Sequence, residues 1–155
     1  MVHIWVNSAV LLIAFAGMEF MAWFTHKYVM HGVLWQLHSD HHVPKHKGFF
    51  QRNDLFFLIF AIPGIICLMI GLPDFNPVFW SGLGITFYGF AYFLVHDIFI
   101  HQRFHFLRNT DNAYFRAIRK AHKMHHKHLG KTNGECFGML WVPWKFFKEG
   151  KNGTK

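Results

Sequence analysis

Ten of the chain's 14 histidines follow one spacing pattern that occurs twice. In each occurrence a pair in the pattern HxxxxH precedes a trio in the pattern HxxHH. The ten residues are His26, His31, His38, His41 and His42, followed by His96, His101, His122, His125 and His126. Histidine clusters can also serve solubility or contact lipid headgroups, but chance does not place both patterns in the same order twice. Since metal binding is the commonest role of such tracts, we interpret the ten as metal ligands.

The spacing also indicates how many ions these imidazoles would hold. On an α-helix, residues at i, i+3 and i+4 fall within an arc of roughly 100°, so each trio is expected to converge on a metal. Residues five apart diverge by about 140°, so each pair is expected to flank a cluster or to grip two ions. Ten imidazoles exceed what one ion needs. We therefore predict about two transition-metal ions per chain, and imidazole suits Fe, Zn, Cu and Ni.

Three carboxylates lie close enough in sequence to support such a site. Glu19 precedes His26 by seven residues, on nearly the same helix face and about 10 Å deeper in an apolar segment. An isolated carboxylate there is costly, so Glu19 should orient a metal-bound histidine, ligate metal or make structural hydrogen bonds. Asp97, directly after His96, and Asp40, beside another histidine, are further candidates for holding a ligand in place or for simple solvation.

The expected position or role differs among the other four histidines. His3 lies 23 residues before the first ligand, about 34 Å along a helix, which excludes it from the site. His46 and His128 are expected at headgroup level or in solvent, with a supporting role as the alternative. His105 follows His101 by four residues, a chelating distance on a helix, so it could be a ligand, support one or lie outside the site.

Three apolar runs provide helices to carry these residues. Hydrophobic residues make up 52% of the 155-residue chain and charged residues only 15%, well below the ~25% of an average soluble domain. The runs cover residues 4–24, 55–72 and 78–100, and the first is about 31 Å long as a helix, which matches a ~30 Å hydrocarbon core. Asn53 and Asp54 are expected to cap the second. Three glycines that permit close helix packing lie in the third: Gly82, Gly84 and Gly89.

The charge distribution gives this bundle an orientation. Every Lys and Arg lies in residues 27–52 or 103–155, and none lies in residues 1–26 or in the turn 72–77. Under the positive-inside rule the N-terminus and the turn are outside and both histidine-rich segments are cytoplasmic. We therefore predict one domain over residues 1–155, an all-α membrane bundle with a cytoplasmic histidine-rich metal-binding cap. It should have three transmembrane helices, or four if the last run breaks.

Two elements are expected after the last span. Residues 113–128 have a near-3.6 period, with histidines on one face and basic residues on the other, which predicts a helix. Residues 136–147 are rich in aromatic residues and are interrupted by Pro143, so we expect them to lie in the membrane interface. Cys67 and Cys136 form no CxxC or CxxCH pattern, which excludes zinc ribbons, thioredoxin-like motifs and c-type haem attachment.

Four stretches of the sequence resemble the bacterial β-carotene 3-hydroxylases, a family within the membrane fatty-acid hydroxylase superfamily of non-haem di-iron enzymes. They are HKYVMHG (26–32), HSDHH (38–42), HDIFIHQRF (96–104) and HKMHH (122–126). The four boxes together specify the superfamily, while HxYxMHG and HDxxxHQR narrow the resemblance to the carotenoid branch. It covers essentially the whole chain.

The resemblance implies that the ten repeated histidines hold two non-haem irons at the cytoplasmic ends of the helices, in a bacterial inner membrane. It implies hydroxylation of the β-ionone rings of β-carotene at C3, with O2 as co-substrate, giving β-cryptoxanthin and then zeaxanthin. Zinc could replace iron on overexpression. No GxGxxG is present, so electrons should come from outside, with ferredoxin and its reductase as the implied donors.

The tail, residues 101–155, carries 12 Lys or Arg against three acidic residues. This charge would attract an acidic ferredoxin or the anionic headgroups of membrane lipid, and no nucleic-acid partner is expected. The sequence leaves two alternatives open. One is a hydroxylase or desaturase of another lipid on the same scaffold, and the other is a membrane metal transport or storage protein.

Overall fold

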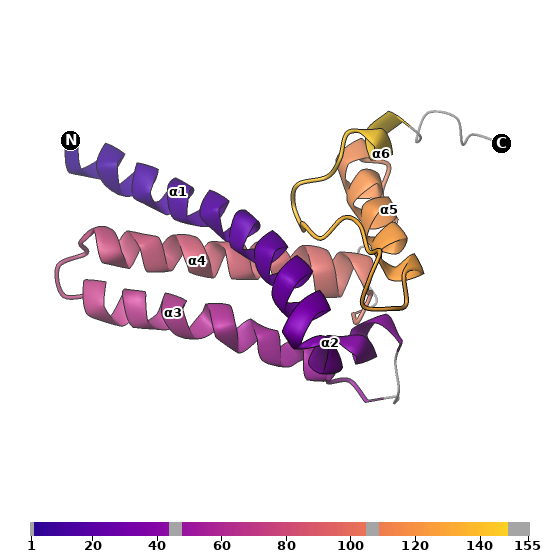
Figure 1. Ribbon diagram of the computed structural model, residues 1–155. Coiled ribbons are helices and arrows are strands. Elements are labelled where there is room, and N and C mark those ends of the chain that lie inside the picture. Colours follow the sequence, from indigo (N-terminus) through magenta and orange to yellow (C-terminus); the bar gives the residue numbers. More distant parts are fainter. Residues whose placement is uncertain (1, 44–47, 105–108, 149–155) are drawn as a thin grey trace.

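The described part of the chain is helical and contains no strand. The computed structural model describes residues 2–43, 48–104 and 109–148. Its α-helices are α1 (Val2–Phe24), α2 (Trp35–His42), α3 (Phe56–Gly71), α4 (Pro77–Phe93), α5 (Ala113–Lys127) and α6 (Lys145–Lys148) (Figure 1). Two π-helices, η1 (Thr25–Val33) and η3 (Leu94–Ile100), and a 3-10 helix, η2 (Arg52–Leu55), complete the set.

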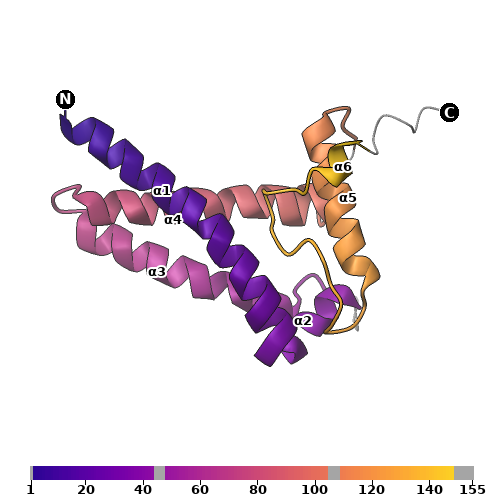
Figure 2. The same cartoon turned by 45° about the horizontal axis from the view of Figure 1, so that its top comes forward.

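Three continuous helices in these residues are long and apolar enough to cross a membrane. They are His3–Val33, Arg52–Gly71 and Pro77–Ile100, which confirms three spans in place of four. The first helix runs past its predicted end at residue 24, because α1 passes into η1 without a break. Helix α4 packs against both α1 and α3, as Figures 1 and 2 show.

Two of the three predicted packing glycines bring the helices together. A Cβ on Gly82 would lie 2.7 Å from Leu68 N in α3, and one on Gly84 would lie 2.5 Å from Leu11 O in α1. At Gly89 the packing prediction is wrong, since an added Cβ would meet nothing within 4 Å.

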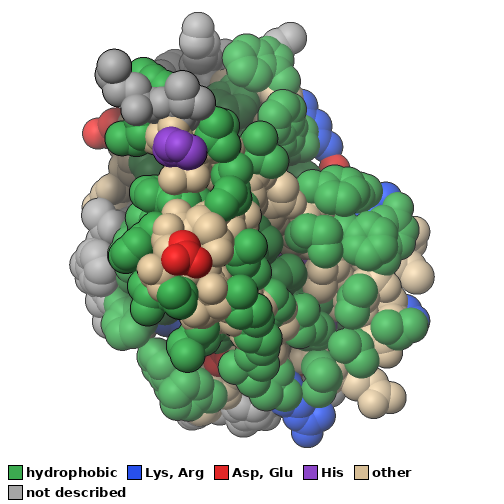
Figure 3. All heavy atoms as spheres, turned by 90° about the vertical axis from the view of Figure 1, so that its left-hand side faces the viewer, with side chains coloured by type: hydrophobic (Ala, Val, Ile, Leu, Met, Phe, Trp, Pro, Cys, Tyr) green, Lys and Arg blue, Asp and Glu red, His purple; other side chains and the backbone are tan. Residues whose placement is uncertain are grey.

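The outer surfaces of the spans are apolar. Ile13, Met69 and Phe90 are 71%, 70% and 61% exposed, as expected for side chains that contact lipid. The N-terminus of α1 and the α3–α4 turn lie at the same end of the bundle (Figure 1), and hydrophobic side chains predominate when the molecule is viewed from that end (Figure 3). This arrangement agrees with the predicted orientation, although the side of the membrane stays a prediction.

The histidine-rich cap occupies the opposite end, where α2 and α5 lie near the ends of the spans (Figure 2). The predicted helix at 113–128 is confirmed as α5, which Asn112 caps by accepting hydrogen bonds from Tyr114 N and Phe115 N. The buried face of α5 packs against Phe146 in α6. In the segment before α6, Trp141 is 79% exposed, and its predicted interfacial position stays a prediction.

Candidate metal centre

Both HxxxxH pairs lie on π-helices. Helix η1 carries His26 and His31, while η3 carries His96 and ends at its C-cap His101, whose N–H donates to His96 O at 2.9 Å. The hydrogen bonds of a π-helix run between residues five apart, so such residues lie above one another on one face. The predicted divergence of about 140° is therefore wrong, because it assumed an α-helix. Each pair contributes both of its imidazoles to one cluster.

Five imidazoles form a first buried cluster, cluster A. It consists of His26, His31, His38, His42 and His125, whose ligand nitrogens all lie within 4.8 Å of one another. The Nε2 atom of His42 is 3.1 Å from that of His31 and 3.1 Å from that of His125. Each side chain is at most 6% exposed, so the cluster is closed to solvent.

A second cluster, cluster B, lies beside the first. Its ligand nitrogens, also within 4.8 Å of one another, come from His41, His96, His101 and His122. His126 adjoins it, with its Nε2 atom 2.9 Å from that of His122. The ring of His126 also stacks on His42 of cluster A at 4.6 Å between ring centroids. All ten predicted ligands are thus brought together, nine of them within the two clusters and His126 at the edge of B.

The two HxxHH trios do not each converge on one metal, and that prediction is wrong. In the first trio His38 and His42 enter cluster A, but His41 points into cluster B. In α5, His122 contacts His126 at cluster B, but His125 enters cluster A. The residues at i and i+4 share a cluster because they lie on one helix face, while the residue at i+3 crosses to the other. Each half of the chain therefore supplies one ligand to the cluster built by the other half.

The hydrogen bonds around cluster A fix which ring nitrogen faces inward. The Nδ1 atoms of His26, His31 and His125 donate to the backbone oxygens of Phe137, Lys131 and Glu135 at 2.9, 3.1 and 2.9 Å. An oxygen acceptor requires the proton on Nδ1, which leaves the lone pair on Nε2. These buried lone pairs converge, and a cation at their centre would satisfy them. The chemistry of this donor set fits a transition-metal ion.

Side chains from the segment before α3 orient two more ligands. His38 Nδ1 donates to Asn53 Oδ1 at 2.6 Å, and His41 Nδ1 donates to Gln51 Oε1 at 2.9 Å. The capping prediction is correct for Asp54, which receives Gln51 N in a capping box, but wrong for Asn53 because its side chain binds His38. The roles of Gln51 and Asn53 as partners of ligands were missed because they lie 10 and 15 residues from the histidines that they orient.

Arg103 contacts the residues that orient the histidines of cluster B. Its guanidinium lies 2.7 Å from Asp54 Oδ1 and 3.1 Å from Asp97 Oδ1, and it donates to Gln51 Oε1 at 3.2 Å. Asp97 in turn accepts from His96 Nδ1 at 3.3 Å. Burial alone would lower the pKa of Arg103, but the hydrogen bond to Asp54 and the charges of Asp97 and Asp54 raise it overall. Arg103 is thus a permanent cation in this network.

Burial also sets the protonation of the ligands outside the spans. Loss of hydration lowers the pKa of His38 and of His42 to about 3, and that of His126 to about 4. Charge repulsion from neighbouring histidines contributes to these lowered pKa values. At neutral pH these imidazoles are uncharged, which is the form that binds metal.

Glu19 supports cluster A indirectly. Its carboxylate accepts hydrogen bonds from Met139 N, Leu140 N and Trp141 N at 2.8–3.0 Å and from Tyr88 OH at 2.7 Å. None of these partners is a histidine. The anchored segment follows directly on Glu135 and Phe137, whose carbonyls receive two cluster A histidines. Glu19 therefore holds in place the loop that orients ligands.

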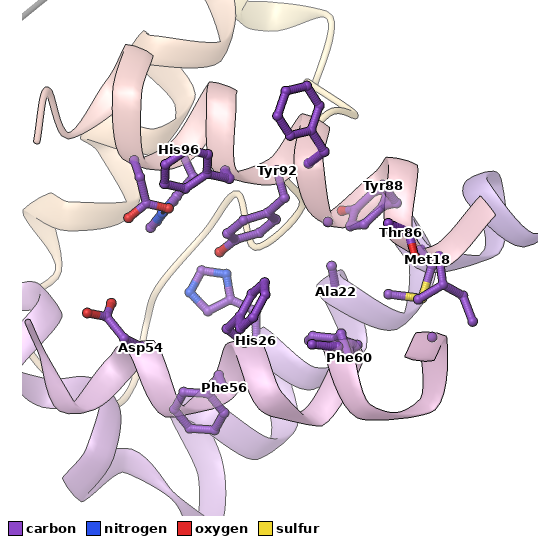
Figure 4. Close-up of a pocket in the computed structure, with 18 of the residues that line it drawn as sticks. Met18, Ala22, His26, Asp54, Phe56, Phe60, Thr86, Tyr88, Tyr92 and His96 are labelled. Atoms are coloured by element: carbon purple, nitrogen blue, oxygen red, sulfur yellow. Dashed lines mark hydrogen bonds and ion pairs between the residues drawn. The ribbon is translucent and has the colours of Figure 1, made fainter. Parts of the chain in front are cut away.

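An apolar pocket of about 520 Å³ between α1, α3 and α4 leads to the clusters. His26 of cluster A and His96 of cluster B both line it, and Figure 4 shows them at the same end. Phe57 and Phe90 line it as well and are 62% and 61% exposed, so the pocket opens on the lipid-facing side of the bundle. The Tyr92 hydroxyl points toward His26 and has no hydrogen-bond partner among the described residues.

Comparison with known proteins agrees with this geometry. The sequence matches the fatty acid hydroxylase family over residues 11–147. The chain belongs to the fatty acid hydroxylase family. It is 40% identical to the β-carotene hydroxylase of Pantoea ananas over 143 residues, which cover 92% of this chain and 81% of that protein.

Further relatives of the chain carry similar names. The β-carotene hydroxylase of Pseudescherichia vulneris is 40% identical over 88% of this chain and 77% of its own length. The chloroplastic β-carotene 3-hydroxylase of Gentiana lutea is 40% identical over 84% of this chain and 41% of its own length. No solved structure matches the chain.

The remaining candidate residues from the sequence have the following positions. Asp40 is buried and accepts from Arg52 N at 2.7 Å, which ties α2 to the segment that orients His38 and His41. His3 is exposed near the start of α1, at the end of the bundle away from the clusters. His128 is the C-cap of α5 and half-buried. His46 and His105 lie outside the described residues.

Proposed function

We propose that this protein is an O2-dependent di-iron hydroxylase that acts on the β-ionone rings of β-carotene at C3. The monohydroxylated product, β-cryptoxanthin, would return for a second hydroxylation to zeaxanthin. The observation that carries the proposal is the pocket: a lipid-facing apolar cavity whose inner end is lined by one histidine of each cluster. β-Carotene has no polar group and resides in lipid, so it would enter such a cavity directly from the bilayer.

The ten histidines would hold two irons, five around cluster A and five around cluster B with His126 included. When bound, the irons supply the oxidising power that attack on an unactivated C–H bond requires. The chain's own residues hold the ligands in one tautomer, guide the ring along apolar walls and exclude water from the clusters. Overexpression could load zinc in place of iron, which would preserve the geometry and abolish oxidation.

Electrons would arrive from a ferredoxin and its reductase. One O2 oxidises the C–H bond to C–OH and yields one water, which consumes two electrons and two protons. Helix α5 lies between the clusters and solvent, and a helix is only ~10 Å across. Its exposed Lys123 and Lys127 lie on the helix that carries His122 and His126, so an acidic donor bound there would be close to cluster B.

The cap is proposed to face the cytoplasm of a bacterial inner membrane, where a soluble ferredoxin has access. Single cysteines placed at Asp74 and at Lys123, in a chain with Cys67 and Cys136 replaced, would test this orientation. Position 74 should react with an impermeant thiol reagent from outside and position 123 only from inside. Labelling of position 74 from the inside alone would reverse the orientation.

The deciding experiment is pigment extraction from β-carotene-producing cells that express the chain, with His38→Ala as the matched inactive variant. We expect hydroxylated carotenoids with the unaltered chain and none with the variant. If the membrane-inserted protein retains iron and a working reductant but leaves β-carotene unmodified, another lipid becomes the expected substrate of the same chemistry. A transport or storage role would instead predict labile metal, and transport would require ligands along a path across the bilayer, whereas both clusters lie at one end of the spans (Figure 2).

A further inference from the structure

The wall of the pocket that α4 provides has a gap at Gly89. Ile85, Gly89, Tyr92 and His96 all line the pocket, and their spacing of four, three and four residues places them on one helix face. An added Cβ at Gly89 would meet nothing within 4 Å, so the space beside this residue belongs to the cavity. Gly89 therefore makes the pocket wider at its own level along α4.

Gly64, on the facing helix α3, has no open space beside it. It also lines the pocket, but a Cβ there would lie 3.1 Å from Ile85 Cγ2. The two helices are in close contact at this level. Of these two pocket glycines, Gly64 serves packing and Gly89 leaves open space.

The position of Gly89 relative to the clusters fits a ring. Gly89 precedes His96 by seven residues, which is about 10.5 Å along the helix axis. The His96 imidazole and the metal it would hold take up part of this distance, so a ring whose C3 atom reached the metal would have its far edge, which carries the geminal methyl groups and the start of the polyene, at the level of Gly89. This edge is the broadest part of a β-ionone end group, whereas an unbranched chain has no such broad part.

We propose that Gly89 is a specificity-determining residue that gives the pocket the width to admit the methyl-substituted ring of a carotenoid. The proposal rests on the proposed function, because it concerns how the same site selects its substrate. A side chain at position 89 would occupy the space of the ring methyl groups without contacting a metal ligand. It would therefore exclude the ring and leave the metal centre intact.

Gly89→Leu tests the proposal, and Gly17→Leu is its matched control. Leucine favours the helix more than glycine does, so loss of helix does not explain an effect. Gly17 in α1 is exposed, does not line the pocket and likewise has nothing within 4 Å of an added Cβ. Overpacking a filled cavity costs enough to weaken binding roughly tenfold to a hundredfold.

Each variant would be purified in nanodiscs and analysed for metal, for β-carotene binding by quenching of tryptophan fluorescence, and for β-carotene conversion in cells. Gly89→Leu should keep its metal but lose binding and conversion by about tenfold or more, while Gly17→Leu should match the unaltered chain. Binding and conversion within twofold of the unaltered chain in metal-loaded Gly89→Leu would overturn the proposal.

A smaller substitution covers the case in which leucine disturbs the metal centre. If Gly89→Leu loses metal, Gly89→Ala decides: a reduced affinity for β-carotene with full metal content supports the proposal, and an unchanged affinity refutes it. Failure of the proposed function gives a different result, because the unaltered chain would then produce no hydroxylated carotenoid. The unaltered chain is therefore assayed for hydroxylated carotenoid before the variants are compared with it.

Discussion

Replacing Glu19 by glutamine should separate the support of the metal centre from metal binding itself. The change keeps the shape of the side chain and removes its charge. One carboxylate oxygen accepts from Met139 N, Leu140 N and Trp141 N, and glutamine can present its carbonyl oxygen to these donors. Its amide group would then replace the oxygen that accepts from Tyr88 OH and from Leu140 N, so the hydroxyl must rotate to become an acceptor and the second contact of Leu140 N is lost.

The loss of attachment free energy follows from the number of charge-assisted hydrogen bonds that Glu19 accepts. A hydrogen bond to a charged group contributes about 1.5–3 kcal/mol, against about 0.5–1.5 kcal/mol for a neutral one. Over three amides the anchored segment would lose about 3 kcal/mol of its attachment to α1. The carbonyls of Glu135 and Phe137 would then hold His125 and His26 less firmly. Loosening of such supports typically lowers metal affinity or activity 10- to 100-fold.

The assay combines three measurements on the same purified protein. We expect full metal content at saturating metal, faster loss of metal to a chelator, and a partial loss of the rate of β-carotene hydroxylation. Tyr88→Phe, which removes only one donor from Glu19, is the control and should show a smaller change in each measurement. Direct ligation by Glu19 would instead remove one metal ion. A Glu19→Gln variant with an unchanged rate and unchanged chelator resistance would refute the anchoring role.

The remaining predictions concern the ligands, the basic surface and the pocket. Alanine at His38, His42, His122 or His126 should lower metal content and abolish product, whereas His3→Ala, about a membrane thickness away, should change neither. The double variant Lys123→Glu, Lys127→Glu should raise the KM for ferredoxin and weaken the dependence of the rate on salt. An artificial reductant should still support activity in this variant. An unchanged KM for ferredoxin would mean that the donor binds elsewhere. Tyr92→Phe should leave the affinity for β-carotene unchanged, because that substrate offers no hydrogen-bonding group, and should weaken binding of the monohydroxylated product by roughly two- to tenfold; equal losses for both ligands would contradict this.

Hydropathy and spacing predicted the spans and the histidines that the fold brings together, because both depend on local sequence. A run of about 20 apolar residues has few alternatives to a membrane helix, and the repeat of HxxxxH and HxxHH selected the ten histidines that lie in or beside the two clusters. The grouping of the ligands was predicted wrongly for a local reason as well. Nothing in the composition of residues 25–33 distinguishes a π-helix from an α-helix, so the common geometry was assumed.

The supports of the ligands could not be predicted because they come from far away in the chain. His26 and the carbonyl of Phe137 are 111 residues apart, and Arg103 reaches Asp54 across 49 residues. A backbone carbonyl has no signature in the sequence, and Gln51 or Asn53 is an ordinary polar residue until the fold brings it to a histidine. Glu19 was selected correctly as a partner-seeking carboxylate, but its partners are the amides of a loop with no motif of its own.

Because His41 and His125 cross between the halves, both clusters can be completed only late in the synthesis of the chain. Cluster A takes four histidines from the first 42 residues, but the fifth, His125, is synthesised 83 residues after His42, the last of the four. At typical translation rates of about 5–20 residues per second, this leaves an interval of roughly 4–17 s in which the nascent chain holds an incomplete site. Cluster B cannot form earlier, since three of its four closest ligands follow residue 95. Completion of both clusters therefore requires the docking of α5, so a fully coordinated metal would be held only after all three spans have been synthesised.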